Sequence, residues 1–323
     1  MRLRVSKLHG REGGIQLSGQ PGWKVYGMTM AGAACWGLIG LFISPLYERG
    51  FSPWDVVAIR AILSFLFLFI FMVLLYRNQL RTRWKDQLLF ACAGVFSLAL
   101  FNYFYFEVFS QSSLSLAVTL LYTGPLFVTV LSRVFFKEPL TLRKGLALAA
   151  AIVGCAFVVG LLPSGALGIS GSTLLLGILS GFCYALYSIF TKPVTKRYSA
   201  LTVTTYTFFY MSVFMLLTSR LFSHPERYLH SDVWVSAVLL ALVSTAAAYI
   251  LYTGGLKHLE AGKAAILATV EPIVAVLMGV LFLGDRLTFW QDGGIALVLY
   301  SAVLVAGRLR KQKATMVGEK IIE

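Results

Sequence analysis

Long apolar stretches alternate with short polar connectors along the chain, and the pattern repeats ten times. Crossing the roughly 30 Å hydrocarbon core of a bilayer takes about 20 apolar residues in helical form. We therefore predict an all-α integral membrane protein with ten transmembrane helices and no inserted soluble domain. The predicted spans are residues 25–47, 54–76, 87–109, 113–136, 141–162, 172–195, 200–220, 233–256, 262–283 and 288–307.

Basic residues predict the orientation of these spans. With the N-terminus placed inside, 23 of the 28 Lys and Arg residues lie in inner segments, 4 lie in outer segments, and Arg60 lies within the second span. Cytoplasmic segments of membrane proteins accumulate Lys and Arg. We therefore predict basic cytoplasmic tails at 1–23 and 308–323 and a location in the cytoplasmic membrane. A cleaved signal is not expected at the N-terminus, because the first apolar stretch is long and nine more follow.

The composition agrees with a membrane protein. Hydrophobic residues make up 58% of the chain and charged residues 13%, against about 25% charged residues in soluble domains. The net charge of +14 follows from the topology and from attraction to anionic lipid headgroups, so no nucleic-acid partner is expected. The cysteines form no C-x-x-C motif or Cys/His cluster, and we expect neither a metal nor another cofactor.

The two halves of the chain resemble each other. SLAVTLLYTGPLFVTVLSRVFFKEPLT aligns with GKAAILATVEPIVAVLMGVLFLGDRLT at an offset of 147 residues, which pairs Pro125 with Pro272 and Glu138 with Asp285. We predict two five-helix repeats, at 24–162 and 163–307. Because five is odd, the second repeat enters the membrane from the opposite side. Such inverted repeats recur in transporters, whose substrate site lies near the midplane.

Glu271 is the acidic residue predicted at the centre of a span, within AILATVEPIVAVLMG. A charge at that depth is costly and usually faces a cavity or a partner. Ala264, Ala268, Ala275 and Gly279 share its helix face, and this small-residue face predicts that Glu271 points into the bundle. Three interpretations are open. In the first, Glu271 is a proton carrier, because burial favours the neutral carboxyl. In the second, it is a partner for a substrate amine. In the third, it is a neutral group with a structural role.

Hydroxyl and aromatic side chains recur at helical spacing in the third, fourth and eighth spans. Their convergence predicts a central pocket for a small amphiphilic solute. The alternative is that they serve hydrogen bonds between helices or interfacial belts. No catalytic residue is assigned. The candidate substrate-binding residues are Glu271, Tyr105, Tyr122, Tyr249, Tyr252, Asn102, Thr119, Trp36 and Tyr184.

Prolines and one arginine within the spans are candidates for motion and gating. Prolines remove a helical hydrogen bond, and carbonyls freed at membrane depth are tolerated at a cavity wall. The predicted hinges are Pro125, Pro272, Pro45 and Pro193; the alternative is kinks that only shape packing. Arg60 is predicted to form a gate or an ion pair with Glu271 or another span. It does not suit Asp55, because five residues along a helix rotate by about 140°.

Several of these features together resemble a known family. CWG at 35–37, Arg60 in the second span and a proline followed 13 residues later by an acid at the ends of spans four and nine resemble the EamA-type branch of the drug/metabolite transporter superfamily. The resemblance covers residues 24–307. It implies a central cavity between the halves, alternating access by rocking helix pairs, and export or exchange of amino acids, other metabolites or toxic compounds.

The chain also departs from that pattern. Gly124 stands where the second half has Glu271, and the first span holds no acidic residue. It therefore differs from the small four-helix drug exporters that depend on a glutamate in their first span, and their mechanism is not carried over.

We therefore expect a secondary transporter that exports a small amphiphilic metabolite, amino acid-like or drug-like, by alternating access. Proton coupling and a monomeric transport unit are options within this prediction. A uniporter or an uptake carrier is an alternative. A membrane-embedded enzyme is disfavoured, because HExxH, G-x-S-x-G, paired membrane aspartates and His clusters are absent from the sequence. A scaffold is disfavoured because it needs no inverted repeat.

Overall fold

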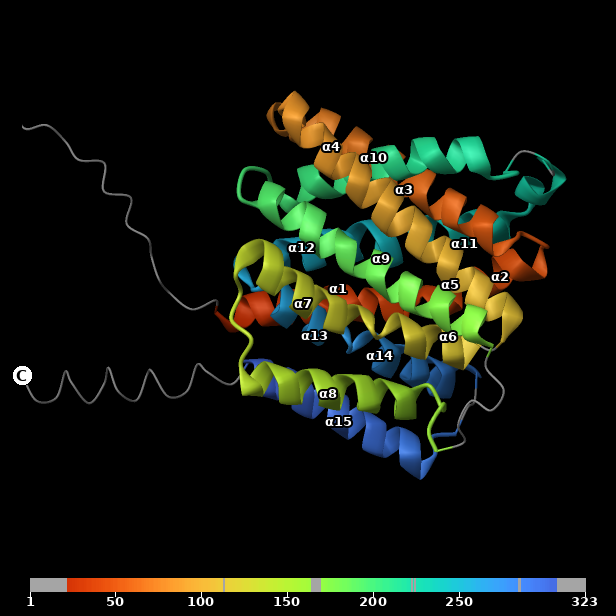
Figure 1. Cartoon of the computed structure of the whole chain (residues 1–323). Coiled ribbons are helices and arrows are strands. Elements are labelled where there is room, and N and C mark those ends of the chain that lie inside the picture. The colour runs from red at the N-terminus through yellow and green to blue at the C-terminus, as the bar shows by residue number, and fades with distance from the viewer. Residues whose placement is uncertain are drawn as a thin grey trace, which may run out of the picture.

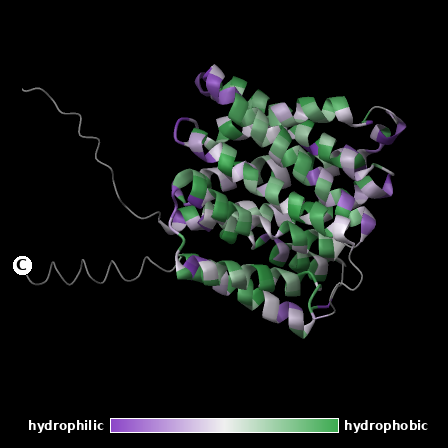
Figure 2. Cartoon of the chain, viewed as in Figure 1, coloured by the Kyte–Doolittle hydropathy of each residue, from purple (hydrophilic) through white to green (hydrophobic). Residues whose placement is uncertain are grey.

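The computed structural model describes residues 22–112, 114–163, 170–221, 223, 225–283 and 286–306. Its helices lie side by side in one bundle, and no strand occurs in these ranges (Figure 1). Hydrophobic residues cover most of the length of each helix, and hydrophilic residues gather at the two ends of the bundle (Figure 2). This distribution is the one expected of helices that cross a bilayer.

The first half of the chain forms eight α-helices and two irregular helical segments. They are α1 (Trp23–Gly37), α2 (Ile39–Glu48), α3 (Pro53–Leu75), η1 (Arg77–Leu80), α4 (Trp84–Cys92), η2 (Ala93–Ala99), α5 (Leu100–Gln111), α6 (Leu114–Leu121), α7 (Gly124–Phe136) and α8 (Leu142–Val158). The second half comprises α9 (Gly171–Thr195), α10 (Ala200–Thr218), η3 (Pro225–Leu229), α11 (Ser231–Ala241), η4 (Leu242–Ala247), α12 (Ala248–His258), α13 (Ala261–Ala268), α14 (Glu271–Met278), η5 (Gly279–Leu283) and α15 (Phe289–Ala306).

The predicted membrane fold is confirmed. Nine helical segments in the described residues are long and apolar enough to cross a membrane. The remaining predicted span corresponds to α8, which has 17 residues and is about 25 Å long at 1.5 Å per residue. It packs along α15 at one edge of the bundle (Figure 1). Where these helices cross, a Cβ atom on Gly154 would lie 2.9 Å from the Gly294 carbonyl oxygen, and one on Gly294 would lie 2.7 Å from the Gly154 carbonyl oxygen. The close approach therefore depends on both glycines.

The contacts between helices follow a twofold pattern that relates the two halves. α1 packs on α12, and its counterpart α9 packs on α5. In the same way α1 contacts α13 and α14, whereas α9 contacts α6 and α7. α3 packs on α10 and α8 on α15. α1 and α9 run in opposite directions through the bundle (Figure 1), so the packing has the symmetry expected of inverted repeats.

Both ends of the described chain lie at the same end of the bundle (Figure 1). We call the end that holds Gly22 and Ala306 the terminal face and the opposite end the far face. The loops after α7 and α12 reach the terminal face, and those after α2 and before α11 reach the far face (Figure 1). The predicted tails lie outside the described residues, and Asp285 does as well.

Several spans are interrupted within the membrane. The fourth breaks between α6 and α7 and the ninth between α13 and α14. Pro125 and Pro272 are the second residues of α7 and α14, a first-turn position where a missing N–H leaves no gap in the helix. The third and eighth spans contain π-helical segments, η2 and η4, at equivalent positions.

The other two prolines do not interrupt their helices. Pro45 lies inside α2 and Pro193 inside α9. The break in the first span occurs at Leu38, seven residues before Pro45, and α9 is continuous. The structure therefore puts helix breaks at Pro125 and Pro272 and leaves Pro45 and Pro193 within regular helix.

Candidate functional site

Glu271 is the first residue of α14 and directly follows the break at Thr269 and Val270. The break is closed by short hydrogen bonds: the Thr269 N–H and hydroxyl both donate to the Ile266 carbonyl, at 3.2 and 2.7 Å. The carboxylate therefore lies at the N-terminal end of a helix, where the helix dipole favours a negative charge. Neither a hydrogen bond nor an ion pair joins the Glu271 side chain to any other described residue.

Tyrosine side chains from four parts of the chain surround this carboxylate. Tyr105 of α5, Tyr122 in the break after α6, Tyr184 of α9 and Tyr249 of α12 all interact electrostatically with Glu271. Tyrosine hydroxyls can donate to or accept from a polar ligand, and their rings supply apolar walls. This group therefore combines a carboxylate with hydroxyls on an aromatic lining.

Arg60 of α3 faces the same region from the far-face half of the bundle. It interacts electrostatically with Tyr47, Tyr249 and Glu271. The residue is 7% exposed, and its Nε is buried without a hydrogen-bond partner. Asp55 does not pair with Arg60; its carboxylate accepts a hydrogen bond from the Ser52 hydroxyl at 2.6 Å in the cap of α3.

Three of the side chains in this group, including Glu271, are partly exposed although they lie inside the bundle. Glu271, Tyr105 and Tyr184 lie deep in the protein, yet each stays half-exposed. Side chains this far inside a bundle stay exposed only where a space accessible to solvent borders them. The geometry can therefore hold a small ligand among a carboxylate, a guanidinium and several hydroxyls.

Closely packed aromatic rings adjoin this cluster and share Tyr249 with it. The Trp36 ring is 4.9 Å from Tyr249 and 5.2 Å from Tyr252, and Tyr187 is 5.1 Å from Tyr249, between centroids. The hydroxyl groups of Tyr187 and Thr253 are 2.6 Å apart, and those of Ser188 and Tyr252 are 2.9 Å apart. We call Trp36, Tyr187, Tyr249 and Tyr252 the aromatic plug.

A buried charge cluster joins several spans at the terminal face. Glu138, which follows α7, accepts from the backbone N–H groups of Ala261 and Gly262 at 2.8 and 3.3 Å. Lys144 of α8 and Lys192 of α9 lie 3.9 and 3.8 Å from its carboxylate oxygens. Glu138 thereby ties the end of the fourth span to the fifth, sixth and ninth.

Glu260 extends this cluster toward the surface. It forms ion pairs with Lys144 and, at 2.7 Å, with Lys263. Burial acts to raise the pKa of the Glu260 carboxyl, but its bonds to Lys144 and Lys263 outweigh burial and hold that pKa below its ordinary value. Glu260 is therefore charged at neutral pH and keeps the cluster connected. We call Glu138, Lys144, Lys192 and Glu260 the terminal-face cluster.

The predicted site residues do not all meet at Glu271. Tyr105, Tyr122, Tyr184 and Tyr249 do, whereas Trp36 and Tyr252 belong to the aromatic plug. Asn102 is buried and donates to the Leu98 carbonyl of its own helix at 2.7 Å. Thr119 is half-exposed, and its carbonyl accepts from the Tyr122 N–H at 3.1 Å. Their assignments as substrate-binding residues remain predictions.

Two neighbours of the cluster are not among the predicted residues. Tyr47, at the end of α2, interacts with Arg60 and Tyr105. Cys155 of α8 is buried and interacts with Glu271. Nothing in the local pattern around Cys155 separates it from other apolar positions. Tyr47 could be found only from its place near the end of the first span.

Gly124 accounts for the asymmetry between the halves. A Cβ at Gly124 would lie 2.6 Å from Cδ1 of Tyr184 and 3.2 Å from the Gly181 carbonyl oxygen. The ring of Tyr184 therefore takes the space that a side chain would need at the position equivalent to Glu271. At these equivalent positions the first half leaves room for a ring of the second half, and the second half contributes a carboxylate.

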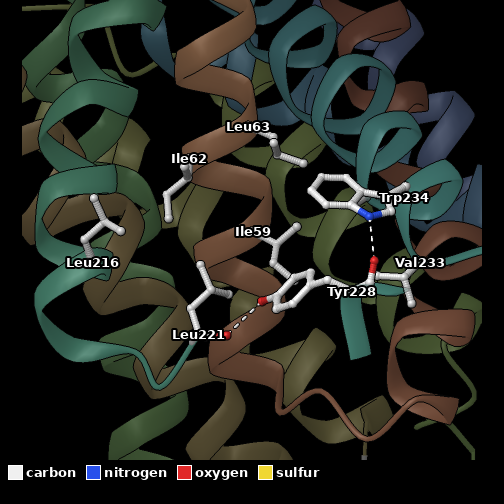
Figure 3. Close-up of a pocket in the computed structure, with 9 residues that line it drawn as sticks. Ile59, Ile62, Leu63, Leu216, Leu221, Tyr228, Val233 and Trp234 are labelled. Carbon is white, nitrogen blue, oxygen red and sulfur yellow. Dashed lines mark hydrogen bonds between the residues drawn. The ribbon is translucent and has the colours of Figure 1, made fainter. Parts of the chain in front are cut away.

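A separate hollow lies on the other side of α3. Its volume is about 320 Å³, and its lining is apolar apart from two aromatic residues with polar atoms, Tyr228 and Trp234 (Figure 3). Both polar atoms are occupied, since Tyr228 donates to the Leu221 carbonyl at 2.9 Å and Trp234 to the Tyr228 carbonyl at 2.8 Å. Ile59 faces this hollow, whereas the next residue, Arg60, faces Glu271. The hollow offers no charged group to a ligand.

The bundle of symmetry-related spans, with polar groups gathered at its centre, defines a multi-pass membrane transporter, and comparisons with known proteins identify its family. The profile of the EamA-like transporter family matches the chain twice, at residues 23–160 and 171–307. The chain belongs to this family. The transporter class points away from enzymatic activity, as the sequence analysis expects.

Individual relatives agree with this assignment. An uncharacterized transporter of Archaeoglobus fulgidus is 30% identical over 215 residues, which cover 65% of this chain and 75% of the relative. The uncharacterized transporter YxxF of Bacillus subtilis is 25% identical over 290 residues, covering 88% of this chain and 89% of YxxF. A solved crystal structure matches with a TM-score of 0.75 at 16% identity, over 90% of this chain and 99% of that chain, which shows the shared fold.

Proposed function

We propose that the chain is a secondary transporter that exports a small amphiphilic metabolite, amino acid-like or drug-like, across the cytoplasmic membrane by alternating access. The observation that carries the proposal is Glu271, which has no hydrogen-bond or ion-pair partner among the described residues, lies at a helix break and interacts electrostatically with tyrosines from several spans. A carboxylate at that depth is costly unless a ligand or a proton serves it. The aromatic lining around it suits a solute with apolar and polar parts.

The packing supports alternating access. In inverted-repeat transporters the two halves exchange roles as access changes sides. The terminal-face cluster joins the fourth span to the fifth, sixth and ninth at the terminal face, ahead of Glu271 along the ninth span. By the distribution of basic residues this face is cytoplasmic. We infer that the structure represents a state closed to the cytoplasm, with the predicted halves 24–162 and 163–307 as the units that rearrange and one chain as the transport unit.

Glu271 is the proposed site of proton coupling. The titratable or charged groups that face it are Arg60, Tyr105, Tyr122, Tyr184, Tyr249 and Cys155. Arg60 carries the positive charge in this set, and it opposes protonation of Glu271, whereas burial favours the neutral acid. A substrate that binds the carboxylate would then compete with a proton, which is the coupling that an antiporter requires.

Flux in proteoliposomes tests this proposal. With a panel of labelled amino acids, amines and drug-like cations, we expect a pH gradient to drive accumulation of at least one compound by the wild type. In Glu271→Gln the pH-driven flux is expected to be abolished, while exchange survives when the same compound is present on both sides at a concentration that saturates the variant. Glu48→Gln is the matched control, because Glu48 is exposed at the end of α2. Unchanged pH dependence in Glu271→Gln would contradict proton coupling at this residue.

A further inference from the structure

Arg60 is a buried cation that forms no ion pair with any described residue. The structure shows no hydrogen bond from its guanidinium and no carboxylate within 4.0 Å of it among the residues described. The nearby acid in its own helix, Asp55, is occupied by Ser52. Breaking a buried ion pair is strongly destabilising because a charge is left without compensation, so an arginine in this state requires an explanation.

Glu271 is a similarly unpartnered charge of opposite sign in the same region. The two residues interact electrostatically, and the Tyr249 hydroxyl interacts with both of them. Even so, the described residues show no ion pair between them within 4.0 Å. The two charges are held apart across space that borders a half-exposed carboxylate.

A ligand with one negative and one positive group would satisfy both residues. Arginine presents paired N–H donors that match the two oxygens of a carboxylate. A carboxylate such as Glu271 accepts from an ammonium group. The surrounding tyrosines would supply a wall for the apolar part of the ligand. A simple cation would leave Arg60 unpaired, and a simple anion would leave Glu271 unpaired.

We propose that Arg60 binds the carboxylate and Glu271 the ammonium group of a small zwitterionic substrate, so that the pair selects compounds with both groups close together. This inference rests on the proposed function, since it names the substrate class of the same transporter. It assigns Arg60 to ligand binding, and it makes the proton and the substrate ammonium group competitors for Glu271.

Ligand truncation tests the proposal on the wild-type protein. The probes are two matched sets: leucine, 3-methylbutylamine and 4-methylpentanoate, and phenylalanine, phenethylamine and 3-phenylpropanoate. Within each set the apolar skeleton is kept and one charged group is removed. Binding to the purified full chain in detergent is measured by titration. Removing one charged group from the ligand leaves its partner residue buried without a hydrogen bond, which costs the full desolvation penalty of that residue. We therefore expect the zwitterion of at least one set to bind at least about tenfold more tightly than both truncated compounds.

Two variants assign the groups to their partners. Arg60→Gln is expected to reduce binding of the zwitterion to the level of the matching amine, with the amine unaffected. Glu271→Gln is expected to reduce it to the level of the matching acid. Arg60→Lys keeps the charge but loses the paired donors, so it should retain part of the preference. Melting temperatures in detergent check that each variant is folded, and the wild-type truncation series stands even if a variant is not.

The outcomes separate this proposal from the proposed function. If the amine binds as tightly as the zwitterion in both sets, or if neither zwitterion binds, the proposal is overturned. In that case flux of any amine or drug-like cation in the liposome panel still supports a transporter. If zwitterions bind preferentially but nothing is transported, the binding assignment stands and the proposed transport function fails.

Discussion

Single residues decide the chemical difference between the halves of this transporter. Glu271 and Gly124 occupy equivalent positions beside equivalent prolines, but only one of them carries a side chain. The absence of a side chain at Gly124 leaves room for the ring of Tyr184, which belongs to the same half as Glu271 and interacts with it electrostatically. The repeat therefore supplies the framework, and a substitution at one position supplies the asymmetric site.

This role of Gly124 predicts a specific effect of Gly124→Ala. The new methyl group would lie 2.6 Å from Tyr184 Cδ1, so the ring of Tyr184 must leave its position. Overpacking of this kind costs about 1–3 kcal/mol, and we expect a lower melting temperature together with a several-fold loss of substrate binding. Gly40→Ala is the control, because a Cβ at Gly40 meets nothing within 4 Å. Equal behaviour of the two variants would show that the position of Tyr184 does not matter.

Helical spacing in the sequence predicts which way a residue points within its own helix, but not its distance from residues on other helices. Spacing within one helix places Glu271 toward the bundle, and the structure brings four of the predicted tyrosines to it. The unpaired state of Arg60 is not predictable in this way, because it depends on distances between helices. For the same reason the terminal-face cluster could not be assembled from sequence, since Glu138 bonds to backbone groups 123 and 124 residues away.

At the scale of elements, interruptions of the helices occur both with and without a proline. The sequence predicts the spans and the interruptions at Pro125 and Pro272, where each proline begins a new half-helix. It does not predict the break at Leu38 or the π-helical segments η2 and η4, because none of these contains a proline. η2 illustrates the cause: a Cβ at Gly94 would lie 2.5 Å from the Thr207 carbonyl oxygen of α10, so packing on a neighbouring helix shapes this segment.

The break between α13 and α14 makes Pro272→Ala informative. Alanine restores an N–H that can donate to the Ala268 carbonyl, and it favours continuous helix. We expect α13 and α14 to join, which would turn Glu271 away from its tyrosine neighbours and lower flux several-fold while the melting temperature stays the same or rises. Pro53→Ala is the control, since Pro53 begins α3 outside any break. Normal flux in Pro272→Ala would show that transport does not require a proline at this break.

At the scale of the whole molecule, the two faces differ in how they are joined. On the terminal face Glu138 is buried and contacts α8, α9 and the start of α13. On the far face the ion pair between Arg49 and Asp232 spans 2.9 Å, and both side chains are more than a third exposed. Exposed pairs contribute about 0–1 kcal/mol, whereas hydrogen bonds to buried charges contribute about 1.5–3 kcal/mol. The terminal face is therefore the more tightly closed of the two.

This difference predicts that Glu138→Gln weakens the closed terminal face. Glutamine can still accept one backbone hydrogen bond, but it leaves Lys192 without a nearby carboxylate and loses the charge-assisted bonds to Ala261 and Gly262. A loss of about 1.5–3 kcal/mol shifts the balance between closed and open states by roughly 10- to 150-fold. Hydrogen–deuterium exchange of the Ala261 and Gly262 amides measures the opening directly and should be faster in the variant. Asp232→Asn breaks the far-face pair and should leave these amides unchanged. If Glu138→Gln also leaves them unchanged, the cluster does not hold the terminal face closed.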